Sequence, residues 1–151
     1  MSHEPPLTRL FAIGYRTNVE DLHEELARRG WDDVRPAYGF ALLAVRESPA
    51  TVTDLARWLG MTKQAASVLV DQMATADLVR RTQDPGDRRA WQVSLTRRGR
   101  RLLTTVEEIY AAQERRWADL IGAERLARLR SDLVTLLVDE SGELPPLRPT
   151  W

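Results

Sequence analysis

Cysteine is absent from the 151-residue sequence. Its absence excludes disulfide bonds, thiolate metal sites, thiol-based redox sensing and a cysteine nucleophile. The two histidines, His3 and His23, lie far apart and belong to no cluster with metal-ligand spacing, so a zinc or iron site is not expected. We therefore expect a protein without a cofactor or a bound metal.

Long hydrophobic runs are also missing. The longest apolar stretches, such as FALLAV at 40–45, are far too short to cross a bilayer. The first ten residues, MSHEPPLTRL, show no positively charged segment followed by an apolar one, so no signal peptide is predicted. With 43% apolar and 29% charged residues, the chain has the composition of a folded globular domain. We expect it to be cytoplasmic.

Lysine is nearly missing, since Lys63 is the only one and all other basic side chains are arginine. Positive and negative charges balance over the whole chain, but their distribution is uneven. Between Thr62 and Arg101, nine basic residues outnumber four acidic residues, and the remainder of the chain carries the opposite excess. Such a basic segment predicts a surface that binds a polyanion. A solvated, arginine-rich loop is the alternative interpretation.

The first part of the chain predicts two helices. Apolar residues recur every three or four positions from Leu7 to Leu26, which indicates an amphipathic helix that ends near Gly30. A second helix is expected to begin near Pro36, a residue suited to a first helical turn. The SPA segment at 48–50 ends it.

The next segment has the pattern of a helix-turn-helix. Thr51 and Asp54 match a capping box, and Gly60 ends the short helix that follows. Thr62 is a suitable N-cap for a second helix, KQAASVLVDQMATA. An ordinary helical hairpin would give a similar pattern. The residues expected to face the core from the second helix are Ala65, Leu69, Met73 and Ala76.

A β-hairpin is predicted directly after this unit. LVRRT at 78–82 is typical of a short strand, 83–90 is rich in turn residues, and WQVSLT at 91–96 alternates apolar and polar residues. A hairpin in this place is the wing of a winged-helix domain.

The remaining chain predicts helices and a tail. Thr96 caps a long amphipathic helix that Gly122 interrupts, and one more amphipathic helix follows. The apolar stripes of 7–29 and 97–138 are too long for a small winged core to cover, so we expect a symmetric dimer. The proline-rich segment 139–151 is expected to be extended.

Four residues at the start of the second helix of the motif suit contacts with DNA. An α-helix fits the major groove. There Gln64 can pair with adenine N6 and N7, Lys63 can reach guanine or phosphate, and Ser67 can bond either class of base. Thr62 lies where free backbone N–H groups favour a phosphate. An ordinary solvated helix face is the alternative, and the adjacent wing favours DNA binding.

The wing tip carries Arg88 and Arg89, which can enter the minor groove. Asp87 is expected to orient an arginine through paired hydrogen bonds. Alternatively, the segment 84–87 simply forms the turn. More arginines follow in the first turns of the next helix, where the dipole disfavours cations and a nearby phosphate would offset that effect.

DRRAWQVSLTRRG resembles the wing signature of the MarR family (multiple antibiotic resistance regulators), an Asp-x-Arg followed by Leu-Thr-x-x-Gly. LARWLGMTKQAASVLVDQMATADLV resembles the helix-turn-helix of that family, and the order of helices matches over roughly residues 7–138. Asp77 departs from the glycine that the family often has there, but aspartate tolerates the left-handed conformation. The signature residues are Asp87, Arg89, Leu95, Thr96 and Gly99.

The resemblance implies a mostly α fold with a small β-wing. A winged helix-turn-helix core is flanked by N- and C-terminal dimerisation helices, and the protein binds inverted-repeat DNA as a homodimeric regulator, which we expect to be a repressor. The expected parts are the N-terminal dimerisation helix 1–34, the DNA-binding domain 35–96, the C-terminal dimerisation helices 97–138 and the tail 139–151.

The resemblance also implies release from DNA by a small aromatic or phenolic ligand. The expected cleft lies between the first, second and fifth helices, where we expect Tyr15, Trp31, Tyr38 and Arg46 to bind the ligand. Arg46 would meet a carboxylate. The alternative is that the aromatic residues pack in the core or interface and Arg46 is solvated.

Two other classes of function are alternatives to a DNA-binding regulator. A winged-helix domain can serve as a protein-interaction module without DNA binding, but it would not need Lys63, Gln64 and an arginine-rich wing tip together. An enzyme is not expected, because no Ser-His-Asp constellation, phosphate loop or metal cluster is present. His23 lies in the charged stretch DLHEELARR, which predicts a solvated helix surface.

Overall fold

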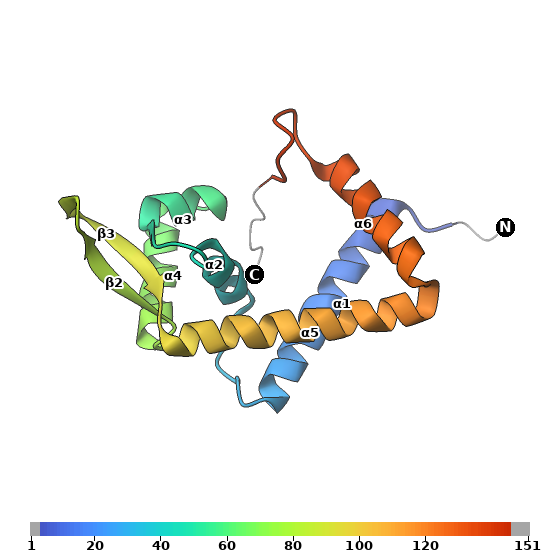
Figure 1. Cartoon of the computed structure of the whole chain (residues 1–151), viewed down its shortest axis with the longest axis horizontal. Coiled ribbons are helices and arrows are strands. Elements are labelled where there is room, and N and C mark those ends of the chain that lie inside the picture. The colour runs from blue at the N-terminus through green and yellow to red at the C-terminus, as the bar shows by residue number, and fades with distance from the viewer. Residues whose placement is uncertain (1–3, 146–151) are drawn as a thin grey trace.

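The computed structural model describes residues 4–145, and within them the chain forms six helices and one three-stranded antiparallel sheet (Figure 1). The fold is mostly α with a small β-wing, as predicted. The helices are α1 Leu7–Arg28, α2 Pro36–Ala44, α3 Val52–Trp58, α4 Lys63–Thr75, α5 Arg97–Ile121 and α6 Ala123–Leu137, and the strands are β1 Ala50–Thr51, β2 Val79–Asp84 and β3 Asp87–Leu95.

The predicted caps of the helix-turn-helix are present. The Thr51 hydroxyl accepts a hydrogen bond from the Asp54 N–H at 3.1 Å, and the Asp54 carboxylate accepts the Thr51 N–H at 3.3 Å. The turn after α3 contains Gly60 with φ of 61°, a conformation that favours glycine. Thr62 then caps α4 by accepting the Ala65 N–H at 3.1 Å. These local hydrogen bonds fix where both helices begin.

The buried face of α4 differs from the prediction at Ala65. Ala65 is exposed, so its assignment to the core was wrong, whereas Ala76 is half-buried and packs against the edge of the core. Adjacent residues point about 100° apart on a helix, and a run of alanines does not show which of them faces inward. The residues that α4 buries are Ala66, Leu69, Val70 and Met73.

The wing is a hairpin of β2 and β3 in which Val79 pairs with Leu95 and Arg81 pairs with Val93. Val93 and Leu95 are buried, whereas Trp91 lies nearer the tip and is 50% exposed. β1 pairs with the other edge of β3, giving the strand order β1-β3-β2. The sequence pattern predicts the hairpin and does not predict β1.

One hydrophobic core joins α2, α3, α4, the base of the hairpin and the first half of α5, and it includes Leu22 and Leu26 of α1. This core holds α4 and the wing on the same body. Its largest fully buried aliphatic and sulfur-containing side chains are Leu26, Leu42, Leu55, Met73, Leu78 and Leu102.

Hydrogen bonds and a close backbone contact join the start of α5 to the turn that follows α4. Asp77 adopts the expected left-handed conformation with φ of 56°. The Leu78 carbonyl accepts the Thr96 N–H at 3.1 Å, and the Thr96 hydroxyl donates to the Asp77 carbonyl at 2.5 Å. A Cβ atom on Gly99 would lie 2.0 Å from the Leu78 oxygen, so only glycine allows this approach.

The terminal helices leave much apolar surface uncovered in the single chain. α1 crosses α5, and α6 turns back at the end of α5 (Figure 1). α6 buries none of its residues. Among the described residues, large exposed hydrophobic side chains on these three helices include Leu7, Leu10, Phe11, Ile13, Trp117, Leu120, Ile121, Leu129, Leu136 and Leu137.

After α6 the chain makes a turn, in which the Asp139 carboxylate accepts the N–H groups of Ser141 and Glu143 at 2.8 and 3.2 Å. The first residues of the tail are therefore folded back and not extended as predicted. Residues 146–151 of the predicted tail lie outside the described residues. Of the helices described, none combines the length and the apolar character needed to cross a membrane.

Candidate nucleic-acid interface

The start of α4 and the wing form the two sides of one groove. Lys63 and Ser67 line it from α4, and Asp87 and Arg89 line it from β3, so the fold brings these four predicted residues together. The groove also includes Thr51 to Thr53, Arg81, Ala90 and Trp91. The helix and the wing follow one another along the chain, and the shared core places them side by side.

Lys63 and Gln64 are exposed, and neither side chain has a hydrogen bond or ion pair within residues 4–145. The Thr62 hydroxyl is occupied as the helix cap. Because this cap accepts only the N–H of Ala65, other backbone N–H groups in the first turn of α4 remain free, next to the ammonium group of Lys63. This end of the helix is suited to bind a phosphate.

Arg81 of β2 ties the wing to α4. Its guanidinium lies 2.8 Å from the Asp71 carboxylate, 3.3 Å from the Ser67 carbonyl and 3.4 Å from the Ser67 hydroxyl. The sequence patterns do not predict that Arg81 is part of the site. One feature of the sequence could, however, have predicted this contact. Arg81 follows the buried Val79 by two residues, so both side chains lie on the strand face toward α4. Arg81 neutralises the one acidic group on the exposed side of α4.

The tip of the wing is built by two aspartates. The Asp84 carboxylate accepts the Gly86 N–H at 2.8 Å, and the Asp87 carboxylate accepts the backbone N–H of Arg89 at 2.9 Å. Within residues 4–145, Asp87 makes no hydrogen bond to an arginine side chain, so its orienting role stays a prediction, whereas the turn-forming role, which is compatible with it, is present. A short aspartate side chain reaches the backbone N–H two residues later. Arg88 and Arg89 remain exposed.

Arg98, at the start of α5, has a structural role. Its guanidinium lies over the Trp31 ring at 4.9 Å, donates to the Ala76 carbonyl and pairs with Asp33 at 3.6 Å. A phosphate is therefore not needed to offset its position near the start of the helix. The other early arginines of α5, Arg97, Arg100 and Arg101, are exposed.

The four residues predicted to bind a ligand lie in different surroundings. Tyr38 is 5% exposed and belongs to the core, and Trp31 packs under Arg98. Arg46 already pairs with Glu107 at 2.5 Å and with Glu47 at 3.3 Å. Tyr15 is 37% exposed on α1. Burial and the neighbouring Tyr110 raise the pKa of its hydroxyl.

A small, mainly apolar cavity does lie between α1, α2 and α5, where the cleft was predicted. Its lining includes His23, Phe40 and Tyr110 and none of the four predicted residues. Burial raises the pKa of Tyr110. The side chains come from three helices, and no single stretch of sequence shows that they meet.

His23 is half-buried beside this cavity and not solvated as its charged neighbours predicted. Its Nε2 atom is buried, and no partner for it lies in the described part of the chain. Burial lowers the pKa of His23, and a hydrogen bond with the Val34 backbone opposes that shift. The imidazole is therefore neutral near pH 7.

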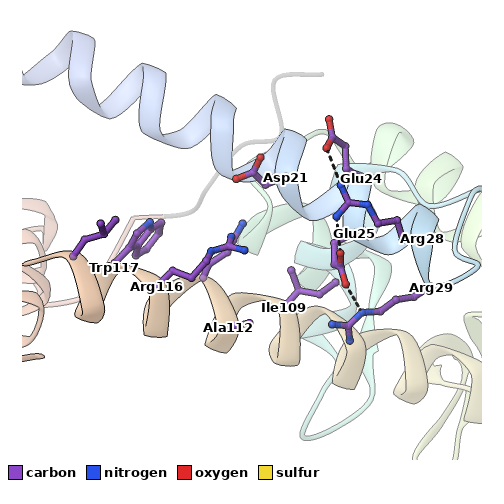
Figure 2. A pocket seen from close by; sticks show the side chains of 11 residues that line it. Asp21, Glu24, Glu25, Arg28, Arg29, Ile109, Ala112, Arg116 and Trp117 are labelled. Carbon is purple, nitrogen blue, oxygen red and sulfur yellow. Dashed lines mark hydrogen bonds and ion pairs between the residues drawn. The ribbon is translucent and has the colours of Figure 1, made fainter.

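A second, more polar groove lies between α1 and α5 (Figure 2). Glu25 lies between Arg28 and Arg29 there, with contacts of 2.9 and 3.0 Å, and Arg29 also pairs with Glu108 of α5 at 3.1 Å. Gln113 lines the groove and is 1% exposed, and neither its amide nitrogen nor its oxygen has a partner within the described residues. This groove contains none of the residues predicted to bind a ligand.

Comparison with known proteins identifies both the central domain and the fold. Residues 32–90 match the family model described as MarR family. No curated protein matches the sequence. Wild-type MarR (apo form) from E. coli has a similar structure, with a TM-score of 0.72 and 22% identity, over 90% of this chain and 99% of that chain.

Two similar structures contain DNA. The transcriptional repressor CouR, bound to a 23-mer DNA duplex, has a TM-score of 0.73 and 26% identity, over 87% of this chain and 92% of that chain. A point mutant of S. aureus MepR, bound to an oligodeoxyribonucleotide, has a TM-score of 0.62 and 20% identity, over 89% of this chain and 97% of that chain. Residues 32–90 therefore resemble the MarR family, and the chain as a whole shares the winged helix-turn-helix fold of these structures.

Proposed function

We propose that this chain is a homodimeric transcriptional regulator that binds specific DNA sequences. The observation that carries the proposal is the groove between α4 and the wing, which combines an unpaired helix start with exposed arginines. The match of residues 32–90 to the MarR family model and the similarity to the DNA-bound structures of CouR and MepR support it.

In the proposed complex, the first half of α4 enters the major groove. Gln64 pairs with adenine, Lys63 contacts guanine or phosphate, and the O–H of Ser67 donates to a base, while Thr62 marks the helix start that binds a phosphate. Arg88 and Arg89 reach the minor groove. Asp87 contributes by shaping the turn that presents them.

The exposed apolar side chains of α1, α5 and α6 support a dimer. A second copy of the same chain buries these surfaces through a two-fold axis, so the same patch serves both protomers. Two recognition helices then contact half-sites roughly 34 Å apart, one turn of DNA. The expected operator is an inverted repeat.

We further propose that the protein is a repressor and that a small aromatic or phenolic ligand releases it. The cavity between α1, α2 and α5 offers a place for an aromatic ring, with Tyr110 and the unpaired Nε2 of His23 available for polar contacts. Tyr15 lies close enough to Tyr110 to be affected by it, and it remains a candidate ligand residue. A ligand acts to the extent that it binds the DNA-incompatible arrangement more tightly.

Selection of bound duplexes from a random pool, followed by titration at several salt concentrations, tests the proposal. Log K is expected to fall linearly with log salt, with a slope of about −0.9 for each phosphate contacted. If the protein retains no duplex at low salt, the proposal is contradicted, and a winged-helix module that binds protein is favoured instead. Light scattering on the same sample tests the dimer.

A further inference from the structure

Val68 lies in the middle of the recognition helix α4 and is 50% exposed. It follows Gln64 by one turn of helix, and it does not belong to the hydrophobic core. The buried side of α4 is formed by Ala66, Leu69, Val70 and Met73, and Val68 points away from it. The isolated chain covers only half of this valine, at the edge of a groove that Ala65 and Leu69 also line.

The residues on either side of Val68 are held by other parts of the domain. On the wing side, Arg81 binds Ser67 and Asp71. On the opposite side, Arg35 donates to the Gln72 amide oxygen at 2.9 Å. Two arginines thus hold the flanks of the exposed face, and Gln64 and Val68 are left between them.

The major groove offers only one apolar group on the base edges, the C5-methyl group of thymine. Gln64 suits the donor and acceptor pair of adenine, and an exposed valine suits that methyl group. We propose that Val68 recognises a thymine in each half-site by packing against its methyl group. This inference rests on the proposed function, since it assumes that α4 enters the major groove.

The spacing of the two residues also limits which bases they recognise. Four residues along an α-helix correspond to about 6 Å. Successive base pairs are about 3.4 Å apart, so Gln64 and Val68 contact the same base pair or pairs no more than about two steps apart. The centre of each half-site is therefore expected to contain an A·T pair whose thymine faces Val68.

The test replaces each thymine of the selected duplex, one at a time, by deoxyuridine, which lacks only the methyl group. At one position in each half-site, wild-type protein is expected to bind about fourfold more weakly, the loss for one methyl group left unburied. The Val68→Ala protein is expected to bind the thymine and uracil duplexes equally at that position. Val68→Ile, which has a branched apolar side chain like valine, is expected to keep the wild-type preference for thymine.

Gln64→Ala is the matched control from the same helix face. It should lose discrimination at an adenine and keep the uracil penalty at the thymine that Val68 contacts. If uracil weakens wild-type and Val68→Ala proteins equally at every position, or weakens neither, Val68 does not recognise a methyl group and the inference is wrong. If wild-type protein retains no duplex from the pool, the proposed function itself fails.

Discussion

Two arginines that look alike in the sequence, Arg89 and Arg98, have opposite surroundings. Arg89 is exposed at the wing tip, whereas Arg98 contacts the Trp31 ring, the Ala76 carbonyl and Asp33. We expect Arg89→Ala to weaken DNA binding without lowering the melting temperature. Arg98→Ala should lower the free energy of unfolding by about 1.5–3 kcal/mol, the value of hydrogen bonds that involve a charged group. Thermal melting and duplex titration of both variants check this pair, and an Arg89→Ala protein that unfolds early would show that Arg89 is structural.

His23 predicts a dependence of stability on pH. Its pKa in the folded chain lies below its ordinary value of 6.5 because burial disfavours the charged imidazole. The unfolded chain therefore binds more protons than the folded one as the pH falls through about 6.5, and the free energy of unfolding decreases. Denaturant unfolding at pH 7.5 and 5.5, at fixed protein concentration, should show this decrease. The decrease should be smaller in His23→Gln, and an equal decrease in both proteins would count against His23.

At the scale of helices and strands, the contact of Gly99 with the Leu78 carbonyl gives a sharp prediction. A Cβ atom at position 99 would lie 2.0 Å from a backbone oxygen, which cannot move without disturbing the turn after α4. Gly99→Ala should destabilise the protein by about 1–3 kcal/mol or more through overpacking.

Gly39→Ala is the matched control, because its Cβ would meet nothing within 4 Å and alanine favours helix. Its melting temperature should be unchanged or slightly higher. Equal effects of the two substitutions would show that the close approach at Gly99 is not important for stability.

What the sequence predicts well is local. The capping residues Thr51, Thr62 and Thr96 start their helices as predicted, because each hydrogen bond joins residues only three positions apart. The alternation of the hairpin likewise predicts that Val93 and Leu95 are buried.

What the sequence does not predict depends on tertiary contacts. The two-residue strand β1 exists only through its pairing with β3. Arg81 reaches α4 only after the hairpin has folded beside it. The residues that line the cavity come from three helices that are distant in sequence. The charged neighbours of His23 along the chain therefore predict a solvated side chain, and none of the aromatic residues predicted to bind a ligand lines the cavity.

At the scale of the whole molecule, the exposed apolar surface of the terminal helices should decide the oligomeric state. Leu120, near the end of α5, is 80% exposed in the single chain. Leu120→Glu places a charge on the surface expected to be covered by a second copy, where an unpaired charge is costly to bury. Light scattering should show more monomer than for wild-type protein, with weaker binding to a duplex that carries both half-sites. A variant that remains dimeric would place the interface elsewhere.

Because Gly99 packs closely against the turn after α4, a tilt of α5 also moves the helix-turn-helix. With 25 residues, α5 is about 37 Å long, and a tilt of about 5° moves one end by about 3 Å relative to the other, close to one base-pair step. Because the close contact at Gly99 makes the helix-turn-helix move together with α5, a small rotation between the protomers of the proposed dimer would take both α4 helices out of register with the duplex. An effector of the kind proposed above would then control DNA binding without touching α4.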